Sequence, residues 1–115
     1  PTFTIPDSII KCPIHDVIEN GKEFIVEAMM AGIKKEDVSI SVEGNVLIIK
    51  AERKEVKDLK YNRKDSFTGK YQKSFTLPDS IDTENISASM EDGVLKVIVP
   101  KLEKETKLSK KIEIK

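Results

Sequence analysis

His15 and Asp16 stand side by side and, with Cys12, are the residues best suited to chemistry. A histidine beside a carboxylate can transfer protons, and a thiol can act as a nucleophile or a metal ligand. No serine or cysteine stands at a nucleophile spacing from His15, and one His with one Cys supplies too few metal ligands. We therefore interpret His15 as a strand residue at or near an interface, and predict no catalytic or metal site.

Glycine and charge patterns exclude further function classes. Gly44, Gly69 and Gly93 fall in predicted turns, and no Gly-x-x-x-x-Gly-Lys-Ser/Thr run supports nucleotide binding. Lys plus Arg and Asp plus Glu number 20 each, which does not indicate a basic face for nucleic acid. No apolar run approaches the roughly 20 residues of a membrane span. We therefore predict no cofactor, nucleic-acid partner or membrane partner.

The start of the chain carries no signal-peptide pattern, and Cys12 is the only cysteine. A lone cysteine cannot form an internal disulfide, which favours a reducing compartment. The expected location is the cytoplasm.

Period-two alternation predicts the elements that must position these residues. In 38–42, Val and Ile alternate with Ser, as in a strand with one buried face. Segment 46–50 is almost continuously apolar, which is typical of a strand buried on both faces. Similar apolar faces recur in 24–30, 71–77, 86–90 and 95–99. Seven or so short strands in 115 residues predict one all-β domain, an immunoglobulin-like two-sheet antiparallel β-sandwich.

Three residue pairs predict tight hairpin turns between apolar runs: Asn20-Gly21, Gly44-Asn45 and Asp92-Gly93. The charged segment from Glu52 to Thr68 interrupts the pattern. It fits a short helix on Val56 and Leu59, which are three residues apart, or a long excursion with a small strand around Tyr61.

The two ends differ from the middle. The first ten residues include four large apolar side chains, which fit either an arm that binds other polypeptides or a first strand: Phe3, Ile5, Ile9 and Ile10. The tail is charged and expected to be extended, and it ends in Ile112-Glu113-Ile114. In an extended strand both isoleucines point the same way and could fill adjacent pockets by strand addition. The alternative is an unstructured tail in which the two isoleucines have no binding role.

Six segments follow one another in a characteristic order: Pro13–Glu19, Met30–Val38, Leu47–Arg53, Gly69–Pro78, Ala88–Leu95 and Val97–Lys101. Their order and spacing resemble the alpha-crystallin domain of small heat-shock proteins. The resemblance covers roughly Pro13 to Ile114. It departs at Ala31, where the family usually has Pro, and at Lys73, where it usually has Arg.

The resemblance implies three parts: a short N-terminal arm (1–12), the sandwich domain (13–101) and a C-terminal extension (102–115). It also implies that 54–68 is a dimer-swapping loop, whose small strand pairs with a partner's strand near 14–18. A lysine at position 73 lacks the planar fork of arginine, so a bidentate pair there is not expected. The implied dimer-interface residues are Ile14, Asp16, Val17, Tyr61 and Lys73.

The family docks an Ile-x-Ile tail in a neighbour's groove, which assigns that role to Ile112 and Ile114. The implied groove, for a tail or a client, comprises Val38, Ile40, Val42, Ile86, Ala88 and Met90. The expected function is that of an ATP-independent holding chaperone, not an enzyme, working as dimers assembled into oligomers. Its expected partners are unfolding proteins and copies of itself. The alternative is a non-catalytic adaptor, co-chaperone or structural coat protein on the same sandwich.

Overall fold

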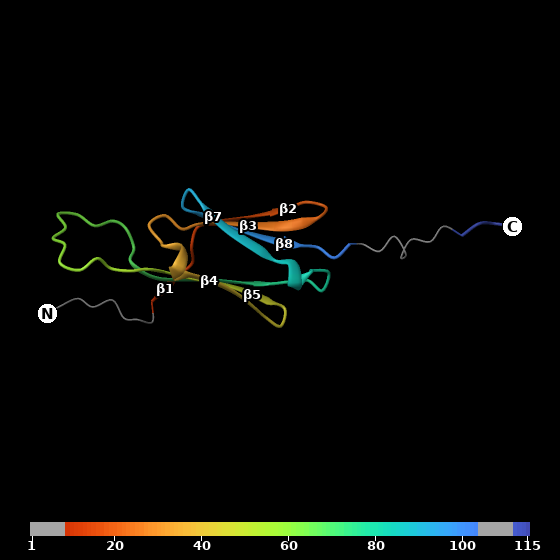
Figure 1. The fold of residues 1–115 in the computed structure, drawn as a ribbon, viewed down its shortest axis with the longest axis horizontal. Coiled ribbons are helices and arrows are strands. Elements are labelled where there is room, and N and C mark those ends of the chain that lie inside the picture. The colour runs from red at the N-terminus through yellow and green to blue at the C-terminus, as the bar shows by residue number, and fades with distance from the viewer. Residues whose placement is uncertain (1–8, 104–111) are drawn as a thin grey trace.

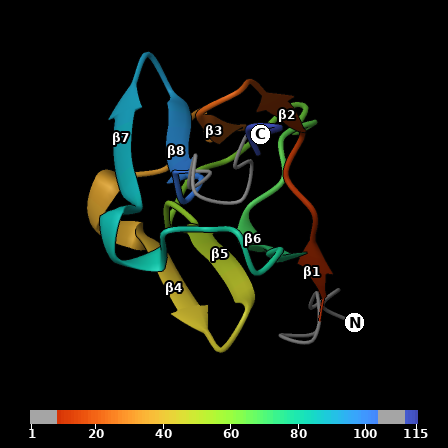
Figure 2. The ribbon, with the colours of Figure 1, turned by 90° about the vertical axis from the view of Figure 1, so that its right-hand side faces the viewer.

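The structure is a computed structural model that describes residues 9–103 and 112–115. Two four-stranded sheets pack face to face, as the end-on view in Figure 2 shows. Sheet A has the order β1–β6–β5–β4, and sheet B has the order β2–β3–β8–β7. The predicted all-β, immunoglobulin-like two-sheet sandwich is therefore confirmed.

The strands have these bounds. Sheet A contains β1 (Ile10–Lys11), β4 (Val38–Glu43), β5 (Val46–Arg53) and β6 (Gly69–Thr76). Sheet B contains β2 (His15–Glu19), β3 (Glu23–Met29), β7 (Ser87–Glu91) and β8 (Val94–Pro100). Two single 3₁₀ turns, η1 (Lys35–Asp37) and η2 (Thr83–Asn85), precede β4 and β7.

The core lies between the sheets because alternate residues of the central strands point inward. Each inward Val, Leu, Ile or Met side chain contributes about 1.5–3 kcal/mol when fully buried, and each Ala less. The buried set comprises Val26, Ala28, Met30, Ile33, Leu47, Ile49, Ala51, Leu77, Ile81, Leu95, Val97 and Val99.

The three predicted hairpin turns are confirmed, since β2–β3, β4–β5 and β7–β8 are antiparallel pairs. Asn20 shows why the first turn forms. Its side-chain oxygen accepts hydrogen bonds from the backbone amides of Lys22 and Glu23, at 2.8 and 2.9 Å. Asparagine thereby satisfies backbone groups that the turn leaves without ladder partners.

One prediction about strand burial is wrong. Leu47 and Ile49 of β5 are buried, but Val46 and Ile48 are only half-buried and Lys50 is exposed. Within the part of the chain that the structure describes, no further layer covers the outer face of sheet A.

The end of the predicted arm contributes a strand. Ile10 and Lys11 form β1, which pairs parallel to β6 at Lys70 and Tyr71. Of the four apolar arm residues, Ile10 thus lies in a first strand, while Phe3 and Ile5 lie outside the described residues. Residues 104–111 of the predicted tail lie outside them as well.

Segment 54–68 protrudes beyond one end of the sandwich (Figure 1). It contains turns and bends but neither a helix nor a strand. The helix alternative on Val56 and Leu59 is therefore wrong. No strand forms around Tyr61 in this chain, and its pairing with a second chain stays a prediction.

Candidate functional site

Strands β4 and β7 lie on the same side of the sandwich, one in each sheet (Figure 2). Each is the last strand of its sheet, so each has one edge without a backbone partner among residues 9–103 and 112–115. Such free edges can accept an additional extended segment.

A hollow of about 150 Å³ lies between these two strands. Val38 and Ile40 of β4 line it from one side, and Ala88 and Met90 of β7 line it from the other. The buried side chain of Leu95 also contributes to its lining. The hollow is therefore an apolar groove bordered by two free strand edges.

Two of the six residues predicted for the groove lie elsewhere. Val42 is exposed near the far end of β4, and Ile86 precedes β7 and packs against the core. Lys35 and Ser89 were not predicted and add polar groups to the lining. Their signal was weak, because charged and hydroxyl side chains are common on any solvated edge.

A larger hollow, about 400 Å³, lies over sheet A. Charged side chains of Asp37, Lys50, Glu52 and Lys70 line it. The groove between β4 and β7 is smaller, but its apolar lining makes it the better candidate for an apolar polypeptide segment.

The tail isoleucines are available for contacts with another molecule. Ile112 and Ile114 are 82% and 95% exposed. Full exposure of two large apolar side chains is unfavourable by about 1.5–3 kcal/mol each relative to burial. A binding partner that covers them would recover that free energy.

The opposite side of the sandwich carries a further edge that is free within the described part of the chain, that of β2. Ile14 is 79% exposed and Val17 is 54% exposed, while Asp16 lies on the outer face of the same segment. Lys73 lies on β6 of the other sheet, and its Nζ is 5.5 Å from the Phe75 ring centroid.

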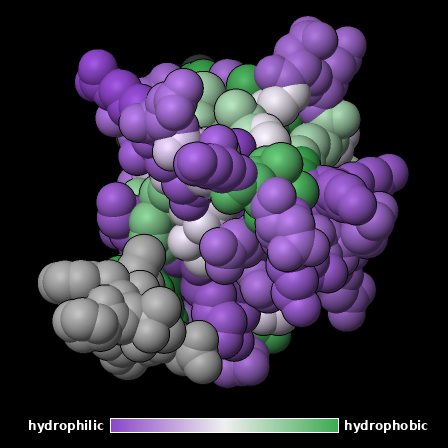
Figure 3. Space-filling view, turned by 90° about the vertical axis from the view of Figure 1, so that its left-hand side faces the viewer, coloured by the Kyte–Doolittle hydropathy of each residue, from purple (hydrophilic) through white to green (hydrophobic). Residues whose placement is uncertain are grey.

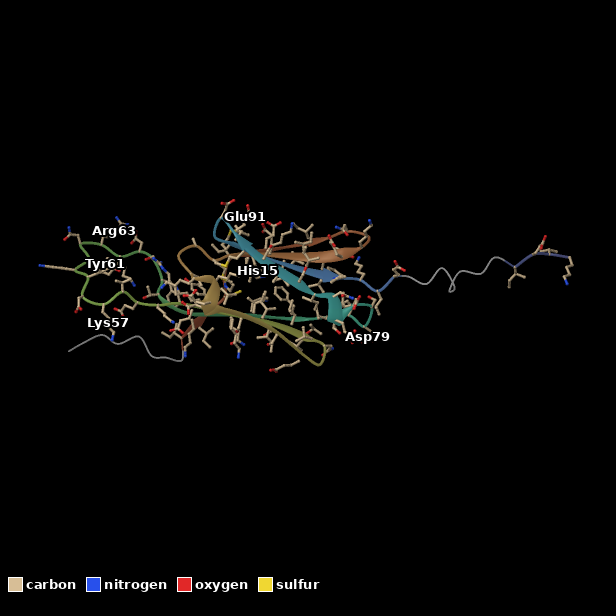
Figure 4. All side chains as sticks on the ribbon, in the orientation of Figure 1. His15, Lys57, Tyr61, Arg63, Asp79 and Glu91 are labelled. Atoms are coloured by element: carbon tan, nitrogen blue, oxygen red, sulfur yellow. The ribbon has the colours of Figure 1, made fainter. Side chains whose placement is uncertain are left out.

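Tyr61 is separate from the other predicted interface residues. It lies at the tip of the protruding loop with Lys57 and Arg63 (Figure 4). Seen from this end, the surface is mostly hydrophilic with smaller hydrophobic areas (Figure 3).

The base of the loop is held by Phe67. Its ring meets Tyr71 edge to face at 5.1 Å, and Lys11 Nζ lies 4.4 Å from its centroid. Its carbonyl accepts a hydrogen bond from the Tyr71 hydroxyl at 3.3 Å. On the other side of the base, Lys54 contacts Asp37 at 3.0 Å. Hydrogen bonding to Asp37 and attraction by its charge raise the pKa of Lys54.

The geometry around His15 does not fit acid–base catalysis. Its Nδ1 donates to the Pro13 carbonyl at 2.8 Å, and its ring meets Phe75 of the other sheet edge to face. Asp16 points to the opposite face of β2, because successive strand residues alternate. His15 therefore packs between the sheets, and the neighbouring carboxylate does not face it.

Two further findings concern ligands and membranes. Residues 9–103 and 112–115 contain no cluster of three His, Cys, Asp or Glu side chains placed to hold a metal ion. Over the same ranges, no helix has the length and hydropathy to cross a membrane.

The fold and the groove together define a small two-sheet sandwich whose described residues leave strand edges free on both sides. Residues 16–115 match the Hsp20/alpha crystallin family, and the chain belongs to this family of small heat-shock proteins. Small heat shock protein C4 of Rickettsia felis is 32% identical over 108 residues, covering 91% of this chain and 65% of that protein. The 17.7 kDa class II heat shock protein of Arabidopsis thaliana is 40% identical over 92 residues, covering 76% and 59%. The chain thus spans less than two thirds of these two relatives.

Solved structures agree with this assignment. A small heat-shock protein from Xylella fastidiosa has a TM-score of 0.76 at 30% identity, over 90% of this chain and 95% of that one. Heat shock protein 16.0 from Schizosaccharomyces pombe has a TM-score of 0.73 at 30% identity, over 92% and 77%.

Proposed function

We propose that this chain is an ATP-independent holding chaperone of the cytoplasm, which binds unfolding proteins and keeps them from aggregating. Unfolding chains expose apolar segments and unpaired strands, and these associate with one another. A protein that covers such segments needs only mass action, with no nucleotide and no catalytic step. The observation that carries this proposal is the apolar groove between β4 and β7.

The groove suits an extended apolar segment of varied sequence. Backbone pairing at a free strand edge is independent of side-chain identity, and alternate side chains of the segment would face the apolar lining. Met90 adds an unbranched, flexible side chain that adapts to different shapes. These features support a broad range of clients.

The same groove suits the tail of a neighbouring copy. Burying Ile112 and Ile114 would contribute roughly 3–6 kcal/mol. Ordering the tail backbone would cost roughly 1–2 kcal/mol per residue, so one docked tail is weakly held. Many tails acting together would hold an oligomer, and clients could displace them one at a time.

Charge and exposure support a dimer formed through the loop. Segment 54–68 carries five Lys and Arg against three Asp and Glu, whereas 14–19 carries two acidic residues and no Lys or Arg. Val56 and Leu59 of the loop are exposed, as are Ile14 and Val17 beside the free edge of β2. Opposite charge and matching apolar surface favour docking of a partner's loop on β2.

The test is aggregation of heated citrate synthase, followed by light scattering after ATP removal with apyrase. We expect this protein at equal subunit concentration to suppress the scattering, and serum albumin at equal mass to leave it unchanged. Scattering that rises as fast with this protein as with albumin would contradict the proposal.

A further inference from the structure

Lys101 is the residue at which the sandwich ends and the C-terminal extension begins. Its backbone amide donates to the Lys22 carbonyl at 2.8 Å, which continues the β3–β8 ladder by one bond. On its other side it forms an isolated bridge with Ile81, and the next amide, of Leu102, bonds to the Ser80 carbonyl. The start of the extension is thus bound to two separate segments.

The Lys101 side chain adds three contacts to the same region. Its Nζ lies 2.8 Å from Glu19 Oε2 and 2.8 Å from the Asn20 carbonyl oxygen. It also lies 4.8 Å from the centroid of the Phe24 ring. Charge-assisted hydrogen bonds and a cation–π contact act on one ammonium group, which is largely shielded from solvent.

The position of the Lys101 side chain near both Glu19 and Phe24 follows from the strand arrangement. Glu19 and Phe24 face each other across the β2–β3 pair, so their side chains share one face. β8 ends at the same end of the sandwich as the β2–β3 turn, opposite the protruding loop (Figure 1). A lysine one residue beyond β8 reaches both groups.

We infer that Lys101 is a positioning residue, a clamp that holds the start of the C-terminal extension against the end of β2. The inference deepens the proposed function, because a fixed starting point limits which neighbouring grooves Ile112 and Ile114 can reach. Fewer accessible directions raise the effective concentration of the tail at those grooves. Because Glu19 belongs to β2, the clamp also joins the tail to the strand proposed to receive a partner's loop.

Hydrogen exchange of amides 101–103 in the full-length protein, read by mass spectrometry, tests the clamp directly. Lys101→Met keeps an unbranched apolar stem but removes the charge. We expect exchange at these amides to rise roughly two- to fivefold, the size that a partly exposed ion pair supports. Lys101→Arg keeps the charge and should restore most of the protection. Lys96→Met, which removes an exposed lysine of β8, is the matched control and should leave exchange unchanged.

Salt dependence separates a clamp from a merely structural lysine. Raising the ionic strength should speed exchange at 101–103 in the wild type and not in Lys101→Met, because salt weakens the ion pair with Glu19. Equal protection in wild type and Lys101→Met, or equal salt dependence in both, would overturn the clamp.

The rate of subunit exchange between fluorescently labelled oligomers tests its consequence for assembly. We expect Lys101→Met to exchange faster by roughly two- to fivefold. If the protein forms no oligomer, the proposed assembly fails while hydrogen exchange still decides the clamp, so the two failures are distinguishable.

Discussion

The imidazole of His15 and the phenyl ring of Phe75 join the two sheets on the side opposite the β4–β7 groove. Their centroids are 5.5 Å apart and their planes lie at 87°, an edge-to-face arrangement. His15 belongs to β2, whose outer edge is free, so this contact braces an edge strand against the other sheet.

A double-mutant cycle measures the coupling energy between His15 and Phe75. His15→Ala and Phe75→Leu, alone and together, should give a coupling energy of about 0.5–1.5 kcal/mol in urea unfolding. All four proteins must be compared at one concentration, because association adds to apparent stability. A coupling energy near zero would show that the two rings act independently.

Gly32→Ala should destabilise the fold by roughly 1–2 kcal/mol or more. Gly32 has φ +78°, and an added Cβ would lie 2.9 Å from Arg53 Nε. Gly21→Ala is the matched control, since nothing lies within 4 Å of its added Cβ and its φ is not positive. The two variants are compared by urea unfolding. Equal stabilities would refute the assigned backbone strain.

Replacing Ile112 and Ile114 with Ala should lower the mass measured by multi-angle light scattering from a large oligomer toward a dimer. The reason is the loss of apolar burial at the docked tail. Glu113→Ala alters the residue between them, which would face away from the groove, and should leave the mass unchanged. An unaltered mass in the double variant would discredit the tail assignment.

Ala88→Glu places a carboxylate in the groove and should reproduce the effect of the tail variant, because burying an unpaired charge is costly. Ser87→Glu adds the same group one position earlier on β7, on the outer face. Thermal melting should show both variants folded. If both assemble like the wild type, the groove is not the tail's docking site.

Tyr61→Asp should convert the dimer into a monomer when introduced beside the Ile112 and Ile114 replacements. The substitution removes the aromatic ring that the predicted pairing would bury against a partner's β2, and it puts a carboxylate, which is costly to bury, in its place. Asn62→Asp adds the same charge to the neighbouring residue, whose side chain would point away from the pairing face of an extended strand, and it should leave the dimer intact. Sedimentation velocity reports the mass, and a Tyr61→Asp protein that remains dimeric would argue against loop exchange.

Much of the sandwich could be predicted from local signals. Alternation in 38–42 and the pair Asn20-Gly21 specify a strand and a turn through interactions between residues a few positions apart. Four groove residues, two on each of β4 and β7, could be assigned in the same way with the help of the family resemblance. Val42 and Ile86 could not, because their position relative to the hollow depends on how the sheets stack.

Other features could not be predicted from the sequence and became apparent only in the folded structure. Segment 46–50 shows one buried face, because an apolar run does not reveal whether a second layer covers it. The parallel pairing of Ile10–Lys11 with β6 also had no local signal, since it joins segments about 60 residues apart.

By itself, the sequence determined most of the segments that become strands, where the chain turns and which family it belongs to, because periodicity and turn chemistry are local properties. Only the tertiary structure decided which strand edges stay free, that His15 meets Phe75, and that Lys101 reaches Glu19 across 82 positions. Those relationships depend on the path of the chain between two sheets, which no short stretch of residues encodes.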